Sequence, residues 1–219
     1  MDDLMDQPPN GSGLTARPAC GTTVGVVDVG SPGKGTIGWA IRVVGTDTQC
    51  TGKCLDDFIK HFACCIKNGG GCLGFEAPLF VPYGRSLDEI LRQRCIDQGK
   101  AWSAAAGAMA LASALGVVPH VIRGLRERLL EHEVSLIDIP SEGSKELLVF
   151  EALVSGEAKA ESHVGDALRA VNEVLSHGFP VATDECAFSL VGAALLRTGW
   201  SDDPSLLRIP SRVVRPQAG

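Results

Sequence analysis

Residues 24–41, with the sequence VGVVDVGSPGKGTIGWAI, limit the folds open to this chain more than any other stretch. The run VGVV at 24–27 is typical of a buried strand, and Asp28 follows at its end. Three glycines then indicate a turn, and residues 36–44 resume as a second strand. The sequence therefore predicts a β-hairpin with a carboxylate at the end of its first strand, where the turn begins.

Asp28 needs a physical explanation, because a carboxylate beside apolar residues is costly unless a cation or hydrogen bonds satisfy it. One explanation is a bound metal ion. The other is that Asp28 caps the glycine-rich turn by accepting hydrogen bonds from the amides beyond it. A second stretch favours the metal: residues 72–75 read as a short buried strand that ends in Glu76. Because parallel strands place their carboxyl ends at one edge of a sheet, Asp28 and Glu76 are expected to lie close together.

A third acid lies in the stretch HVGDALRAV, which predicts a helix over residues 163–175 with Ser162 as its N-cap. His163 and Asp166 are three residues apart and therefore share a face of that helix. The pair could bind a metal ion. Alternatively, His163 is a capping or surface histidine, and Asp166 stabilises the positive end of the helix dipole.

Length and composition predict one domain over residues 21–215. Residues 1–20 lack hydrophobic periodicity and are expected to form a flexible N-terminal arm. The chain begins without the basic and apolar regions of a secretory signal, so its eight cysteines are interpreted as reduced thiols of a cytoplasmic protein. Five of these cysteines fall between residues 50 and 72, but their spacing does not match a zinc knuckle, and we expect buried apolar side chains instead.

The net charge of −6 argues against a protein that coats nucleic acid through bulk charge, yet it leaves room for a local basic groove. The candidates for phosphate contacts are Lys34, Arg85, Arg92 and Arg94.

Further elements follow from periodicity and from turn signals. We expect helices over residues 51–67, 87–98, 100–115, 124–132 and 184–197, and strands over 117–122, 147–153 and 206–214. The alanine-rich segment 100–115 is interpreted as a core helix and not as a membrane span, so no membrane partner is expected.

The three acidic motifs together resemble a known family. The stretches VVDVGSPGKGTIGWAI, FEAPLF and HVGDALRAV are similar, in this order, to motifs of the RuvC-like Holliday-junction resolvases within the ribonuclease H superfamily. The resemblance covers residues 24–175 and implies an α/β fold, with a central mixed five-stranded sheet whose first three strands are antiparallel, flanked by helices.

Carried over by this resemblance, Asp28, Glu76 and Asp166 are metal ligands, and His163 is a fourth catalytic residue where the pattern has either His or Asp. The expected activity is Mg²⁺-dependent hydrolysis of phosphodiester bonds in DNA or RNA, branched substrates included, by two metal ions about 4 Å apart. Mn²⁺ is the expected substitute for Mg²⁺. Glu151 is either an extra ligand or a strand residue that faces solvent or Lys145.

Three further readings stay open. The chain could be a non-catalytic ribonuclease H-like module that binds a partner protein or nucleic acid, which its net acidity favours. An actin-like phosphotransferase has a similar first hairpin, but that fold normally needs two such domains. Because the resolvases act as dimers, the resemblance also implies a homodimer, although no stretch of the sequence identifies a dimer face.

Overall fold

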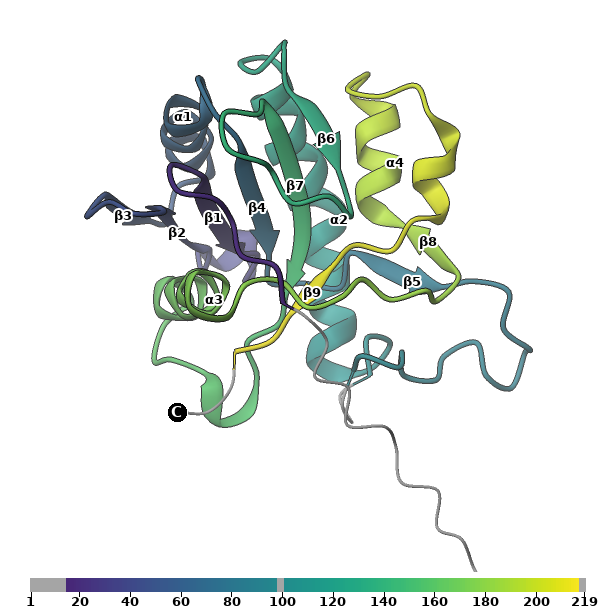
Figure 1. Cartoon of the computed structure of the whole chain (residues 1–219). Coiled ribbons are helices and arrows are strands. Elements are labelled where there is room, and N and C mark those ends of the chain that lie inside the picture. Colours follow the sequence, from purple (N-terminus) through teal and green to yellow (C-terminus); the bar gives the residue numbers. More distant parts are fainter. Residues whose placement is uncertain (1–14, 98–100, 217–219) are drawn as a thin grey trace, which may run out of the picture.

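The computed structural model describes residues 15–97 and 101–216. A mixed sheet forms the centre of the molecule, and helices cover both of its faces (Figure 1). The strands are β1 (Thr23–Asp28), β2 (Gly38–Val43), β3 (Gln49–Gly52), β4 (Gly71–Phe75), β5 (Phe80–Pro82), β6 (Glu133–Ser135), β7 (Glu146–Ala152), β8 (Ala187–Ser189) and β9 (Val213–Val214). The α-helices are α1 (Leu55–Ile66), α2 (Ala105–Arg126), α3 (His163–His177) and α4 (Leu190–Arg197), and short 3₁₀ helices span Pro32–Lys34, Gly156–Ala158 and Pro204–Arg208.

The strand order of the central sheet is β3-β2-β1-β4-β7-β6, and β9 also pairs with β7. β1 and β2 pair antiparallel, as do β2 and β3, which is the expected arrangement of the first three strands. β4 is parallel to β1, and β7 is parallel to β4. The carboxyl ends of these three strands therefore lie at one edge of the sheet.

Successive side chains along a strand point to opposite faces of the sheet. Val24 and Val26 pack into the cluster that α3 covers, whereas Val27 packs into the cluster that α1, α2 and α4 cover. By the same alternation Asp28 belongs to the α3 face. In β7, Glu151 follows Val149 onto the opposite face.

The number of strands differs from the expected five, because the described part of the chain forms a seven-stranded sheet. The two additional strands are β6 and β9, which pair with different parts of the same edge of β7. Of the expected strand over residues 206–214, the first three residues belong to the 3₁₀ helix Pro204–Arg208, residues 209–212 form no helix or strand, and only Val213–Val214 pairs with β7.

The expected strand over residues 117–122 is wrong, and this segment lies inside α2. Val118, Val121, Ile122 and Leu125 are fully buried at helical spacing, so their burial favours a continuous helix even though Pro119 removes one backbone donor. The helix expected over 124–132 is therefore the end of α2 and the turn that follows it.

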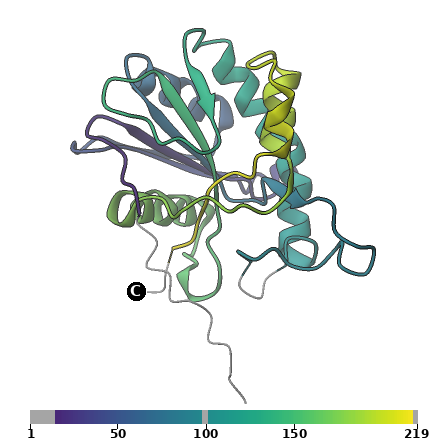
Figure 2. The same cartoon turned by 45° about the vertical axis from the view of Figure 1, so that its right-hand side comes forward.

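Two other expected helices differ from the structure. Residues 87–97 form turns, and residue 98 lies outside the described ranges. Leu87 and Leu91 are exposed, so this segment has no apolar face to bury as a helix, and it lies beside the start of α2 (Figure 2). The helix expected over 184–197 begins only at Leu190, because residues 187–189 pair with β5 as strand β8.

α2 is long and apolar enough to cross a membrane by length and composition alone, a test that core helices of soluble proteins also pass. Much of the arm expected over residues 1–20 lies outside the described residues, which begin at Thr15. Within the described part, Ala16 pairs with Phe179 as an isolated antiparallel bridge.

Candidate metal centre

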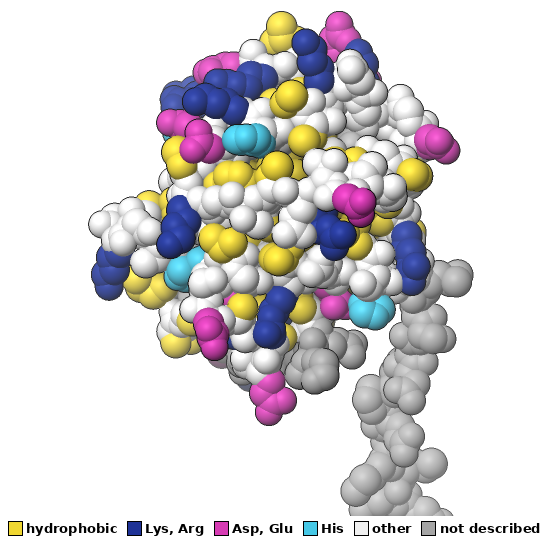
Figure 3. Space-filling model, turned by 90° about the vertical axis from the view of Figure 1, so that its left-hand side faces the viewer, with side chains coloured by type: hydrophobic (Ala, Val, Ile, Leu, Met, Phe, Trp, Pro, Cys, Tyr) yellow, Lys and Arg dark blue, Asp and Glu magenta, His cyan; other side chains and the backbone are white. Residues whose placement is uncertain are grey.

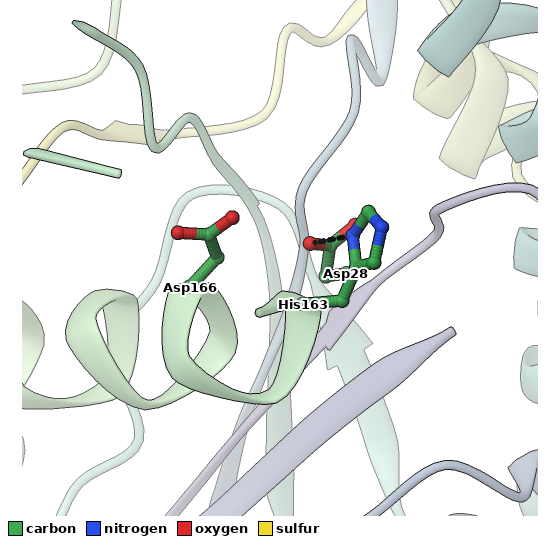
Figure 4. Close-up of side chains that lie close together, drawn as sticks. All are labelled: Asp28, His163 and Asp166. Atoms are coloured by element: carbon green, nitrogen blue, oxygen red, sulfur yellow. Dashed lines mark hydrogen bonds and ion pairs between the residues drawn. The ribbon is translucent and has the colours of Figure 1, made fainter. Parts of the chain in front are cut away.

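Asp28, His163 and Asp166 converge at the carboxyl edge of the sheet (Figure 4). Each offers one ligand atom, and these atoms all lie within 4.8 Å of one another. The Nδ1 atom of His163 is 2.6 Å from Oδ2 of Asp28. Asp28 and Asp166 are buried, whereas the His163 side chain is 39% exposed, so the group opens to solvent on the histidine side.

The first turn of α3 places His163 and Asp166 on one face. As expected, Ser162 caps this helix, and its hydroxyl accepts a hydrogen bond from Gly165 N at 3.1 Å. Gly38 of β2, paired with Asp28, lets the helix come close to the sheet: a Cβ atom at this position would lie 2.2 Å from the backbone carbon of His163. The missing side chain of Gly38 therefore sets the distance between helix and strand.

Asp28 also caps the glycine-rich turn. Its Oδ1 atom accepts a hydrogen bond from Gly30 N at 2.9 Å, and Gly30 has φ +44°, a backbone conformation that favours glycine. The two explanations considered for Asp28 are therefore compatible, because one carboxylate oxygen holds the turn and the other faces His163.

Glu76 follows β4, one strand away from Asp28, and only 10% of its side chain is exposed. Burial raises the pKa of Glu76 to about 10, and a hydrogen bond with Asp28 and the negative charge of Asp28 act in the same direction. As a carboxylate, Glu76 has a buried Oε2 atom that receives no hydrogen bond from the described residues. The raised pKa favours the protonated form of Glu76, and only the charge of Lys159 acts in the opposite direction.

Lys159 places a cation beside this group, and sequence reasoning missed it. Its Nζ atom lies 3.8 Å from Oδ2 of Asp166 and 3.9 Å from Oε1 of Glu76, and its side chain is half exposed. Asp166 also accepts a hydrogen bond from Ala160 N at 2.6 Å, which fixes the segment that carries the lysine. The signal in the sequence is only a lysine in the polar linker before Ser162, and such lysines usually face solvent.

Glu151 lies at the same edge of the sheet, paired with Phe75, but it does not join this group. Its carboxylate is fully buried on the opposite face and binds Arg94 through two bonds, Nη1–Oε2 at 2.8 Å and Nη2–Oε1 at 2.6 Å. It also accepts a hydrogen bond from Leu79 N. Glu151 thus serves neither as a ligand of this group nor as a partner of Lys145, which pairs with Glu131.

The expected contact of Arg94 with a phosphate is not met, because Arg94 is only 1% exposed. Its guanidinium group binds Glu151, Asp97 and the carbonyl of Phe80, and it stacks on the Phe80 ring at 4.6 Å. A buried guanidinium with these partners cannot meet an external ligand.

The other three basic residues expected to meet nucleic acid lie nearer the surface. Arg85 pairs with Glu185 and donates to two backbone carbonyls, and Arg92 forms an exposed pair with Glu89. Lys34 ends the 3₁₀ helix that follows Asp28 and is exposed. Among the residues that the structure describes, Lys34 forms no ion pair, so it is the freest of the expected phosphate contacts.

The described cysteines form no metal-binding group, and all eight are free thiols. Of the five cysteines between residues 50 and 72, only Cys72 is buried, and burial raises the pKa of its thiol. Cys54 and Cys64 are exposed, so the expectation of buried side chains is wrong for these two.

The group formed by Asp28, His163 and Asp166 fits a divalent cation on chemical grounds. The group offers two carboxylates and one imidazole as ligands, and Glu76, which is not part of it, follows the adjacent strand β4. Nothing in the geometry selects a particular ion. Comparisons with models of protein families, with curated proteins and with solved structures found no match to this chain.

Proposed function

We propose that this protein is a Mg²⁺-dependent nuclease of the ribonuclease H-like type that hydrolyses phosphodiester bonds. The observation that carries the proposal is the convergence of Asp28, His163 and Asp166 within 4.8 Å, with the buried Glu76 at the end of the adjacent strand. Acids from three separate elements meet here at an edge of the sheet, and a turn cap or a helix dipole would not require this arrangement.

The sheet supports the proposal in a second way. Three antiparallel strands are followed by two parallel strands in the order β3-β2-β1-β4-β7, with helices on both faces. This arrangement agrees with the fold that the sequence resemblance implies. The proposed ligands lie at the carboxyl ends of β1 and β4 and in the first turn of α3, as the resemblance also implies.

A divalent ion bound by these residues would polarise the phosphoryl oxygens and lower the pKa of a bound water. The residues of the chain would do the remaining work. Gly30 N holds the Asp28 carboxylate in place. His163 directs Nδ1 at Asp28, which leaves Nε2 on a partly exposed ring to exchange a proton with water or with the leaving oxygen. Lys159, on the side of Asp166 and Glu76, is placed to neutralise phosphate charge.

The face shown in Figure 3 favours a few local contacts with the substrate over a broad basic track. On the face shown in Figure 3, Lys and Arg side chains are scattered among acidic and apolar ones. Together with the net charge of −6, this favours a substrate held mainly at the metal centre.

The test is cleavage of labelled single-stranded, duplex, RNA–DNA hybrid and branched substrates with Mg²⁺ or Mn²⁺. The purified protein should cut at least one substrate, and Asp28→Asn should lose about 10³-fold or more in rate. Asp56→Asn, which changes an exposed acid elsewhere, should cut like the wild type. Equal cleavage by wild type and Asp28→Asn would show that the activity does not come from this site.

A second candidate is a non-catalytic module that binds a partner protein or nucleic acid. It is favoured by the net acidity of the chain and by the ion pairs and burial that occupy Arg85, Arg92 and Arg94. Saturable nucleic-acid binding without cleavage, unchanged in Asp28→Asn, would support this candidate over the nuclease.

A further inference from the structure

The first half of α2 is apolar except for one serine. The stretch AAGAMALASA spans residues 105–114, and Ser113 carries its only polar side chain. Because serine is a weaker helix former than alanine, a serine among these alanines needs a physical reason. This half of the helix extends past the carboxyl ends of β4 and β7, beyond the same edge of the sheet at which Asp28 lies (Figure 1).

The hydroxyl of Ser113 is bonded outside its own helix. Serines inside helices commonly donate to a carbonyl of the preceding turn. Ser113 Oγ instead donates to the carbonyl oxygen of Gly30 at 3.0 Å, across 83 residues of sequence. Packing supports this contact, since Val29 beside Gly30 and Ala114 beside Ser113 lie in one buried cluster. The bond therefore joins α2 to the turn that follows β1.

Gly30 is held from both sides. Its N–H donates to Oδ1 of Asp28 at 2.9 Å, and its carbonyl accepts the bond from Ser113. Gly30 has φ +44°, and a glycine has more backbone freedom than any other residue. The two bonds hold the peptide groups before and after Gly30, so together they restrict both of its dihedral angles.

The orientation of the Asp28 carboxylate depends on these bonds. Oδ1 is held by the N–H of Gly30, while Oδ2 lies 2.6 Å from Nδ1 of His163. A shift of Gly30 would turn the carboxylate away from His163 and Asp166, the other two members of the group within 4.8 Å. Residues that orient the ligands of a metal ion affect its binding even though they do not touch it.

We propose that Ser113 is a positioning residue of the metal centre: its hydroxyl fixes Gly30, and Gly30 fixes Asp28. The metal affinity of the site then depends on where α2 lies, and a displacement of the start of this helix would lower it. The inference rests on the proposed function, because it concerns the same metal centre.

Calorimetric titration of the full chain with Mn²⁺ tests this. Ser113→Ala removes the hydroxyl and leaves a residue that favours the helix, so the variant should fold. We expect its affinity for Mn²⁺ to fall about 3- to 10-fold, less than for a residue that bonds a ligand directly. Ser113→Thr keeps a hydroxyl and should bind Mn²⁺ within about twofold of the wild type.

Ser103→Ala is the matched control. Ser103 Oγ also donates to a backbone carbonyl, that of Leu91 at 2.6 Å, but this bond does not lead to Asp28. Urea unfolding of the three variants measures the structural cost of each change separately from its effect on Mn²⁺ affinity.

The inference is overturned if Ser113→Ala binds Mn²⁺ as tightly as the wild type, if Ser113→Thr binds as weakly as Ser113→Ala, or if Ser103→Ala weakens binding to the same extent. These results contradict the inference alone. Absence of saturable Mn²⁺ binding by the wild-type protein would contradict the proposed function as well.

Discussion

His163 and Asp28 are 135 residues apart in the sequence, and their side chains meet with Nδ1 of the histidine 2.6 Å from Oδ2 of the aspartate. This contact joins the first turn of α3 to the end of β1. It depends on the close approach of α3 to β2, where the backbone of His163 lies over Gly38. The proposed metal centre therefore depends on a residue that offers no ligand.

Gly38→Ala should damage the site without touching a ligand. Its Cβ atom would lie 2.2 Å from the backbone carbon of His163, so the start of α3 must move away from Asp28. We expect a loss of about 1–3 kcal/mol in the free energy of unfolding, measured with urea, and at least about tenfold weaker Mn²⁺ binding. Gly33→Ala is the matched control, because a Cβ there meets nothing within 4 Å. Unchanged Mn²⁺ affinity in Gly38→Ala would show that the approach of the helix does not shape the site.

Glu76 should make the metal-free protein less stable as the pH rises. Its pKa is about 10 in the folded state, above the ordinary value of 4.5, so the folded state holds a proton that the unfolded state loses between these values. The contribution of Glu76 to stability is thus fully present below about pH 4.5 and falls as the pH rises toward 10.

Glu76→Gln should remove this dependence and stabilise the metal-free protein by about 1–3 kcal/mol at pH 7. Urea unfolding in EDTA at several pH values measures the effect, with the exposed Glu142→Gln as the control. If the stability of the wild-type protein changes with pH in the same way as that of Glu76→Gln, Glu76 is not protonated in the folded state.

Lys159→Gln should strengthen metal binding. The ammonium group lies within 4 Å of Asp166 and Glu76, so its positive charge would repel a metal ion bound beside Asp166. Because Lys159 is half exposed, water screens this effect, and we expect only about two- to fivefold tighter Mn²⁺ binding at low salt. Lys145→Gln, which changes a lysine paired with Glu131, should have no effect. Weaker Mn²⁺ binding in Lys159→Gln would mean that the lysine organises the ligands and does not compete with the metal.

Glu151→Gln should destabilise the fold and leave the metal affinity of the folded protein unchanged. The variant removes one of the two acidic partners of the buried Arg94 guanidinium. We expect this loss to lower the free energy of unfolding by roughly 3–5 kcal/mol. Urea unfolding measures the loss, and Mn²⁺ titration at low temperature measures the affinity. The double variant Glu151→Leu/Arg94→Met should recover part of the stability, because the unpaired guanidinium is removed and the buried Asp97 keeps its ion pair with Arg215 at 3.6 Å. Loss of Mn²⁺ binding by folded Glu151→Gln protein would instead make Glu151 a ligand.

Local patterns were enough to predict the elements that carry the proposed ligands. The VGVVD strand, the strand before Glu76 and the helix that begins at His163 all occur, and the parallel pairing of β1 and β4 brings Asp28 and Glu76 to one edge. These elements have strong signals of their own: short apolar runs bounded by turns, and a capped amphipathic helix.

The sequence failed where long-range packing decides the outcome. Pro119 suggested a break, yet the buried face of α2 continues through it. Arg94 looked like a surface cation because its partner Glu151 is 57 residues away in the chain. Side chains alternate along β7, so Glu151 points to the same face of the sheet as Val149. That face can be assigned only once the pairing of β7 with β4 is known. Lys159 had no local signal, because its position is set by the bond between Asp166 and the backbone of Ala160.

The central claim, that Asp28 and Asp166 bind a divalent cation beside His163, is tested most directly by calorimetric titration with Mn²⁺. The wild-type protein should bind Mn²⁺ saturably, and Asp28→Asn and Asp166→Asn should each weaken this binding about 100-fold, while Asp56→Asn binds like the wild type. Absence of saturable binding in the folded wild-type protein, or equal affinity in Asp28→Asn, would contradict the account.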